Sequence, residues 1–167
     1  ANICLGQGAA TLTATGGSDY TWEPASGLSA TTGAEVTATP KVTTTYTVTG
    51  VDTTTGCSNT ATVTVTVKPL PEVEAGPNLT VCDNPEPIQL KGQPAGGTWS
   101  GPHVTEGNFV PAGKGDFVLR YTYTNAEGCT NFDELTMTVT EALVANAGED
   151  KAVCLNSGSF ALPASPA

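Results

Sequence analysis

Charged and aromatic side chains are scarce in this sequence. Only 13% of its 167 residues are charged, six are Lys or Arg, and 6% are aromatic. The formal net charge is -10, and so few basic residues cannot form the clustered Lys and Arg surface that binds phosphate backbones. We therefore expect no nucleic-acid partner.

Long apolar runs are missing too. No stretch approaches the roughly 20 apolar residues of a membrane-spanning helix, so we expect no membrane insertion. No long segment holds a 3.6-residue apolar period, which argues against helices. The N-terminal residues are not a basic segment followed by an apolar one, as a signal peptide would be. A secreted protein would need that signal upstream, so we expect a mature or internal piece of a longer protein.

Threonine and valine in alternation dominate what is present. Tyr46 and Val48 alternate with threonines, and so do Val63, Val65 and Val67. Period-2 alternation of β-branched residues indicates strands with one buried face. Residues 52–56 supply a turn, so 45–67 is predicted to be a β-hairpin. Frequent Gly and Pro between such strands fit an all-β sandwich.

The chain also repeats itself. The motif Gly56-Cys57-Ser58-Asn59 returns as Gly128-Cys129-Thr130-Asn131. Cys4, Cys82 and Cys154 each lie eight residues before a leucine. Such self-similarity at a fixed period is the signature of tandem modules.

Three units follow from this repeat. Residues 1–68 form the first, which is expected to lack its first strand because nothing before Ala1 matches 72–79. Residues 69–141 form a complete second unit, and 142–167 form the truncated start of a third. Prolines at the start of the second unit indicate a semi-rigid linker. We predict tandem immunoglobulin-like β-sandwich modules in a linear array.

Four aromatic residues are the core candidates. Trp22 and Trp99 follow the first cysteine of their units by 18 and 17 residues. Each is expected on a central strand, as in immunoglobulin-like sandwiches. Tyr46 and Tyr121 lie on the first strands of the two hairpins. Core packing is the expected role of all four, and for the two tryptophans ligand stacking is the rival interpretation. Carbohydrate binding would require exposed aromatics among Tyr20, Trp22, Tyr121 and Tyr123.

The cysteines indicate disulfides in an oxidising compartment rather than a metal site. Pairing within a unit would give Cys4–Cys57 and Cys82–Cys129. Strand directions, however, place Cys82 and Cys129 at opposite poles of a sandwich, roughly 30 Å apart, whereas a disulfide needs Cα atoms within about 7 Å. The same strand directions place Cys4, at the far pole of the first unit, next to Cys129, at the near pole of the second, so that a head-to-tail bond Cys4–Cys129 can also form. Both pairings stay open, and Cys154 has no partner of its own kind in this sequence.

Candidate chemistry is sparse. His103 is the single histidine, so a Ser-His-Asp set cannot be built in both units, and the cysteines lack the close spacing of zinc ligands. We expect no enzymatic activity and no cofactor. Calcium is the one metal alternative, at Asp52 or at Glu149-Asp150, since hard cations bind carboxylate oxygens. The pattern Asp-x-Asp-x-Asp, which would support calcium, is absent.

Several motifs together resemble a known repeat type. They are the segments 75–82, 95–101 (Ala-Gly-Gly-Thr-Trp-Ser-Gly) and 44–48, together with the two Gly-Cys-(Ser/Thr)-Asn turns. On these residues the chain resembles the PKD-like/Ig-like repeats of giant Bacteroidota surface proteins. The most similar type is the SprB-like gliding-motility adhesins exported by the type IX secretion system.

The resemblance implies an extracellular stalk on a bacterial cell surface. Its partners would be neighbouring repeats of the same chain, a surface or polysaccharide ligand, and the motility or secretion machinery of the cell envelope. It also implies an O-glycosylation acceptor at Thr53. Three alternatives remain: a spacer in a secreted polysaccharide-degrading enzyme, a set of carbohydrate-binding modules, and a subunit of a surface filament.

Overall fold

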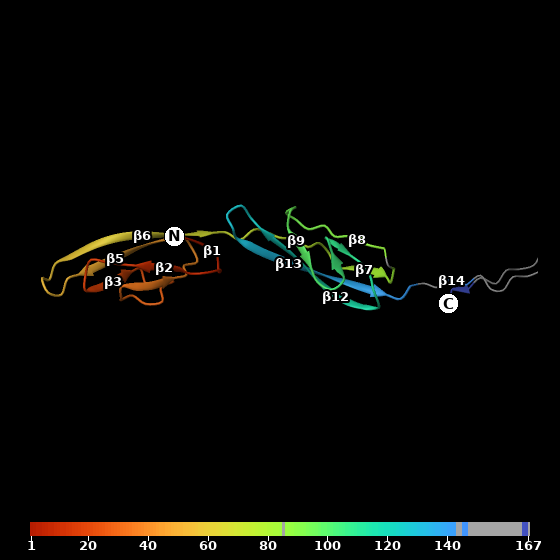
Figure 1. Cartoon of the computed structure of the whole chain (residues 1–167), viewed down its shortest axis with the longest axis horizontal. Helices are drawn as coiled ribbons and strands as arrows, with labels where there is room; N and C mark the ends of the chain where they lie inside the picture. The colour runs from red at the N-terminus through yellow and green to blue at the C-terminus, as the bar shows by residue number, and fades with distance from the viewer. Residues whose placement is uncertain (85, 143–144, 147–164, 167) are drawn as a thin grey trace, which may run out of the picture. The chain divides into compact units, whose positions relative to one another are not determined.

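The computed structural model describes residues 1–84, 86–142, 145–146 and 165–166. All regular structure among these residues is β (Figure 1), and the predicted all-β, immunoglobulin-like class is confirmed. The chain divides into two compact units. Unit 1 comprises Ala1–Glu72 and Tyr123–Asn131, and unit 2 comprises Val73–Thr122 and Phe132–Ala167. The short segment 123–131 lies in the second sequence repeat but belongs in space to unit 1.

Unit 1 holds six strands in two sheets. One sheet has the order β1-β6-β5-β3 and the other pairs β2 with β4. β1 runs parallel to β6, while the other pairs are antiparallel. The strands are β1 (Asn2–Cys4), β2 (Ala10–Thr13), β3 (Asp19–Glu23), β4 (Glu35–Ala38), β5 (Thr44–Val51) and β6 (Ser58–Lys68).

The core of unit 1 lies between these two sheets. Every second residue of β2, β3 and β4 is buried, and Tyr46 and Val65 contribute fully buried side chains from β5 and β6. Trp22 is 2% exposed, and its indole Nε1 donates to the carbonyl oxygen of Gly33 at 2.9 Å. The Tyr46 hydroxyl donates to the carbonyl of Ser26 at 2.7 Å. Both polar groups are therefore satisfied inside an apolar core.

Unit 2 repeats this plan. Its four-stranded sheet has the order β7-β13-β12-β9, and a three-stranded sheet has the order β10-β11-β8. A separate pair, β14 (Ala145–Asn146) and β15 (Ser165–Pro166), is antiparallel. Residues 143–144, 147–164 and 167 of the predicted third unit lie outside the described residues. The strands of the two larger sheets are β7 (Leu79–Cys82), β8 (Ile88–Gln89), β9 (Thr98–Ser100), β10 (Val104–Thr105), β11 (Asn108–Phe109), β12 (Gly115–Thr124) and β13 (Thr130–Thr140).

The two tryptophans take matching positions with different burial. Trp22 pairs with Val48 and Trp99 pairs with Tyr121. Tyr121 is 3% exposed, whereas Trp99 is only half-buried and lies 5.0 Å from the Tyr121 ring, centroid to centroid. The expected central-strand placement is wrong for both, because β3 and β9 are edge strands of their sheets. The long β5–β6 and β12–β13 hairpins occupy the middle instead.

A comparison of β1 with β7 shows whether the first unit lacks a strand, as expected from the sequence. β1 pairs in parallel with β6, which places Cys4 opposite Lys68. β7 pairs in parallel with β13 in the same way, which places Cys82 opposite Thr140. The two strands are therefore equivalent, so unit 1 has a counterpart of β7. Within residues 72–78 the strand pairing is limited to an isolated bridge between Glu74 and Gln93.

A close approach at Gly97 yields a stability prediction. A Cβ atom there would lie 2.5 Å from the carbonyl oxygen of Thr122 and 2.5 Å from Cζ of Tyr121. We expect Gly97→Ala to lower the free energy of unfolding of unit 2 by about 1–3 kcal/mol, because the crowded backbone must shift. Urea unfolding followed by Trp99 fluorescence, in a Trp22→Phe background, checks this. Thr98→Ala, at an exposed neighbour, is the control; an equal effect in both variants would contradict the crowding argument.

Asp133 gives unit 2 a pH dependence. Its Oδ2 accepts a hydrogen bond from the backbone N–H of Ala75 at 2.8 Å. Hydrogen bonds from the backbone N–H groups of Ala75 and then Glu134 hold the pKa of Asp133 below its usual range. A lowered folded-state pKa means that the stabilisation is complete above the unfolded-state pKa of about 3.9. It is lost as the pH falls through the folded-state value.

We therefore expect Asp133→Asn to destabilise unit 2 at pH 7, with a difference from the native chain that shrinks as the pH falls below about 3.9. Urea midpoints measured between pH 7 and pH 2.5 check the trend. Glu86→Gln makes the same charge change at an exposed side chain and should leave the pH profile of the native chain intact. A constant difference across the whole range would show that Asp133 does not act through its charge.

Candidate functional site

A disulfide joins Cys4 to Cys129, with Cα atoms 5.6 Å apart. The two cysteines lie 125 residues apart in the sequence, in successive sequence repeats. In space both belong to unit 1, because the loop between β12 and β13 lies in segment 123–131. Cys129 is fully buried and Cys4 is half-buried.

The backbone around β1 fixes the position of Cys4. The N–H of Leu5 donates to the carbonyl of Lys68 at 2.8 Å, which continues the parallel ladder past the cysteine. The N–H of Gln7 then donates back to the carbonyl of Cys4 at 2.9 Å. This closes a tight turn with Gly6 at φ 70°, a conformation that glycine adopts without steric cost.

The loop that carries Cys129 is equally well defined. Oδ1 of Asn125 accepts hydrogen bonds from the N–H groups of Glu127 and Cys129, at 3.0 and 2.9 Å. The N–H of Asn125 donates to the carbonyl of Cys129 at 3.0 Å. Asn is favoured at turns because its side chain can cap its own backbone in this way. These hydrogen bonds hold Cys129 within a closed turn.

Three polar contacts surround the bond, all inside unit 1. Gln7 Nε2 donates to the carbonyl of Thr130 at 2.7 Å. Asn131 Nδ2 donates to the carbonyl of Pro71 at 2.9 Å. Lys68 Nζ lies 3.8 Å from Glu127 Oε1, a part-exposed pair that contributes at most about 1 kcal/mol. Together these contacts hold the loop against β1 and against the segment that leaves β6.

The within-unit pairings are corrected by the structure. Cys57 and Cys82 are free and exposed, so neither Cys4–Cys57 nor Cys82–Cys129 forms. Cys4 lies beside Lys68 at the C-terminal end of β6, whereas Cys57 precedes its first residue. Eleven residues of strand separate these positions by roughly 35 Å, far beyond the reach of a disulfide. Cys154 lies outside the described residues.

The other candidate residues from the sequence are His103, Asp52 and Thr53. His103 is an exposed residue whose ring centroid lies 4.9 Å from that of Phe117. Asp52 caps its own turn: Oδ1 accepts from the N–H of Thr54 at 2.9 Å and Oδ2 from the hydroxyl of Thr55 at 2.9 Å. The backbone bond from Thr54, then the hydroxyl bond from Thr55, lower the pKa of Asp52. Thr53 is exposed in that turn.

Within the described part of the chain, no three His, Cys, Asp or Glu side chains gather as metal ligands would. Glu149 and Asp150, the second calcium alternative, lie outside the described residues. Among the described residues no helix is long and apolar enough to cross a membrane.

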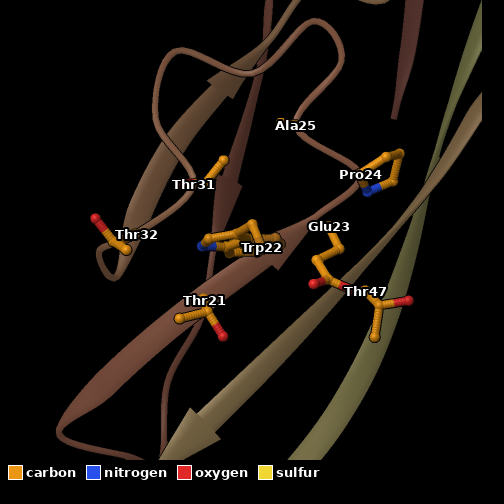
Figure 2. A pocket seen from close by; sticks show the side chains of 8 residues that line it. All are labelled: Thr21, Trp22, Glu23, Pro24, Ala25, Thr31, Thr32 and Thr47. Atoms are coloured by element: carbon orange, nitrogen blue, oxygen red, sulfur yellow. The ribbon is translucent and has the colours of Figure 1, made fainter.

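An open hollow lies beside Trp22, the residue for which ligand stacking was the rival interpretation. Figure 2 shows the eight residues that line it, and the Trp22 side chain lies between the loop of Thr31 and Thr32 and the end of β3 at Glu23. Trp22 is nevertheless only 2% exposed, so its ring offers no face to a sugar. Tyr20 and Tyr121 are buried as well, and Tyr123 is half-buried. These four aromatics form no stacking platform.

Sequence reasoning missed Gln7, Lys68 and Glu127. One signal was available for Asn131, since the repeated Gly-Cys-(Ser/Thr)-Asn motif predicts a function for its asparagine. The other three belong to no repeated motif, so only the three-dimensional structure reveals their contacts.

No protein-family model and no curated protein matches the sequence. Solved structures that align with it include extracellular domains 3–5 of Drosophila OTK, at 14% identity and TM-score 0.36, over 84% of this chain and 59% of that one. Titin domains Z1Z2 in complex with telethonin align at 14% identity and TM-score 0.32, over 85% and 92%. Sidekick-1 immunoglobulin domains 1–4 align at 14% and 0.34, over 89% and 51%. At these values the similarities carry no argument about function.

Proposed function

We propose that this chain is a non-catalytic repeat segment of a secreted cell-surface adhesin. Its sandwich units, joined in series, form a stalk that carries contacts to a surface or a polysaccharide. The stalk stands outside a bacterial cell, where the motility or secretion machinery of the envelope exports it and, in gliding motility, moves it. The motif resemblance around residues 95–101 and the two Gly-Cys turns supports the gliding role.

The disulfide between successive sequence repeats is the observation that carries the proposal. Cytosolic thiols are kept reduced, so structural disulfides are typical of exported proteins. A bond that links one repeat to the next by a second covalent route suits a segment that transmits force.

Adhesion by such a stalk would depend on multivalency. The core aromatics are buried, so contacts to polysaccharide would come from exposed polar groups such as the threonine rows. Each contact of that kind is weak, but many copies acting together can raise avidity by about 10²–10⁴. A single chain would therefore bind poorly where a dense array binds well.

Beads that display the oxidised chain at rising density test this. We expect retention on glass and on polysaccharide-coated surfaces to rise steeply with chain density. Beads with the same density of reduced, alkylated chain are the control. No retention at any density would overturn the adhesin role and favour a passive spacer, whereas equal retention of both bead types would show that adhesion does not need the disulfide.

A further inference from the structure

Cys57 and Cys129 occupy the same position in the two hairpins. The N–H of Asp52 donates to the carbonyl of Cys57 at 2.9 Å, as the N–H of Asn125 does to the carbonyl of Cys129 at 3.0 Å. Each turn is capped by its own Asp or Asn side chain, although the turn before Cys57 is one residue longer. The loop before Cys57 therefore closes on its cysteine through the same backbone hydrogen bond as the loop that holds the bonded Cys129.

Cys82 matches Cys4 as closely. Each ends a short strand that runs parallel to the last strand of its hairpin. The next residue then continues the ladder in both places: Leu5 N–H donates to Lys68 at 2.8 Å, and Asp83 N–H donates to Thr140 at 2.8 Å. Among its described residues the chain thus holds one formed bond between a strand-end cysteine and a hairpin-loop cysteine, and one free cysteine of each kind.

We infer that Cys57 and Cys82 each form a bond of the same kind as Cys4–Cys129, and that each forms it with a further copy of this repeat. Cys57 pairs with the strand-end cysteine of a preceding repeat, and Cys82 pairs with the hairpin-loop cysteine of a following one. This inference rests on the proposed array and names its covalent linkage. Asn59, in the position of Asn131, would supply the same hydrogen bond to the preceding segment that Asn131 gives to Pro71.

The bond forms by thiol–disulfide exchange with a low-molecular-weight disulfide such as oxidised glutathione. A thiolate of one cysteine attacks that disulfide, releasing one glutathione thiol and leaving a mixed disulfide on the protein. The thiolate of the second cysteine then attacks the mixed disulfide and releases the second glutathione thiol. Two protein thiols become one disulfide, and the small disulfide is reduced to two thiols. Both protein thiols are exposed, so neither step requires unfolding.

Two single variants test the pairing with the chain itself as the partner. Both variants are made in a Cys154→Ser background. The Cys57→Ser variant then keeps Cys82 as its free cysteine, and the Cys82→Ser variant keeps Cys57. We expect the mixture, concentrated in a glutathione redox buffer, to give one covalent heterodimer and no larger species. The chain with both cysteines should form a ladder of multimers, and the Cys57→Ser, Cys82→Ser double variant should stay monomeric.

Mass spectrometry identifies the links. Trypsin leaves Cys57 and Cys82 on one peptide, 42–91, and cleavage at Glu72 separates them. We expect Cys57–Cys82 links to exceed Cys57–Cys57 and Cys82–Cys82 links by about tenfold, which corresponds to about 1.4 kcal/mol of matching contacts. Links in the statistical proportions of equally reactive thiols, or no links, would overturn the inference. None of these measurements depends on adhesion to a surface. A negative result here therefore leaves the adhesin role untouched, and loss of the adhesin role leaves this inference untouched.

Discussion

Stretching the oxidised chain between its two ends should leave residues 5–128 unextended, because the Cys4–Cys129 bond carries the force past them. A residue adds at most ~3.3–3.6 Å to an extended chain, so the 125 residues of sequence separation correspond to roughly 410–450 Å of length. That length should appear only after a reductant is added. Single-molecule force spectroscopy in oxidising and in reducing buffer measures it directly.

Two variants control the pulling experiment. Cys4→Ser should extend fully without reductant, and Cys57→Ser should behave like the native chain. Pairing within the units would hide two shorter segments of 53 and 47 residues, or roughly 175–190 and 155–170 Å. Full extension of the oxidised native chain would contradict the bond altogether.

Replacement of Cys4 by serine should lower the free energy of unfolding of unit 1 by about 2–5 kcal/mol. The bond closes a long loop and so restricts the unfolded chain, an effect that grows with loop length. Because each unit contains one tryptophan, a Trp99→Phe background makes Trp22 fluorescence a specific probe of unit 1. Urea unfolding of that background, with and without Cys4→Ser, measures the difference.

Cys57→Ser is the matched control, because Cys57 is a free and exposed cysteine of the same chain. Its effect should stay within about 0.5 kcal/mol, as expected for a surface position. A cost at Cys57 as large as that at Cys4 would indicate that the two are bonded to each other.

The strands of both hairpins could be predicted from the sequence because their signal is local. Alternation of Val, Tyr and Thr depends only on neighbours in the chain, and it indicates β5 and β6 within a residue or so of their bounds. Edge and central positions depend instead on pairing between distant strands. Trp22 and Trp99 were therefore expected on central strands and lie on edge strands.

The candidate site was predictable in part for the same reason. Successive strands of a sandwich alternate in direction, and these directions can be counted along the sequence. That count was enough to predict the Cys4–Cys129 pairing as an alternative. Its choice over Cys4–Cys57 needs the parallel register of β1 on β6, which brings Cys4 beside Lys68. The contacts of Gln7 and Glu127 also depend on that register, and no residue pattern in the sequence predicts the register.

A tryptic map of the unreduced chain tests the central claim most directly. Trypsin places Cys4 on peptide 1–41, Cys57 and Cys82 on 42–91, and Cys129 on 121–151. The Cys4–Cys129 bond predicts a covalent pair of 1–41 with 121–151 that disappears on reduction. A pair of 1–41 with 42–91, or of 42–91 with 121–151, would contradict it.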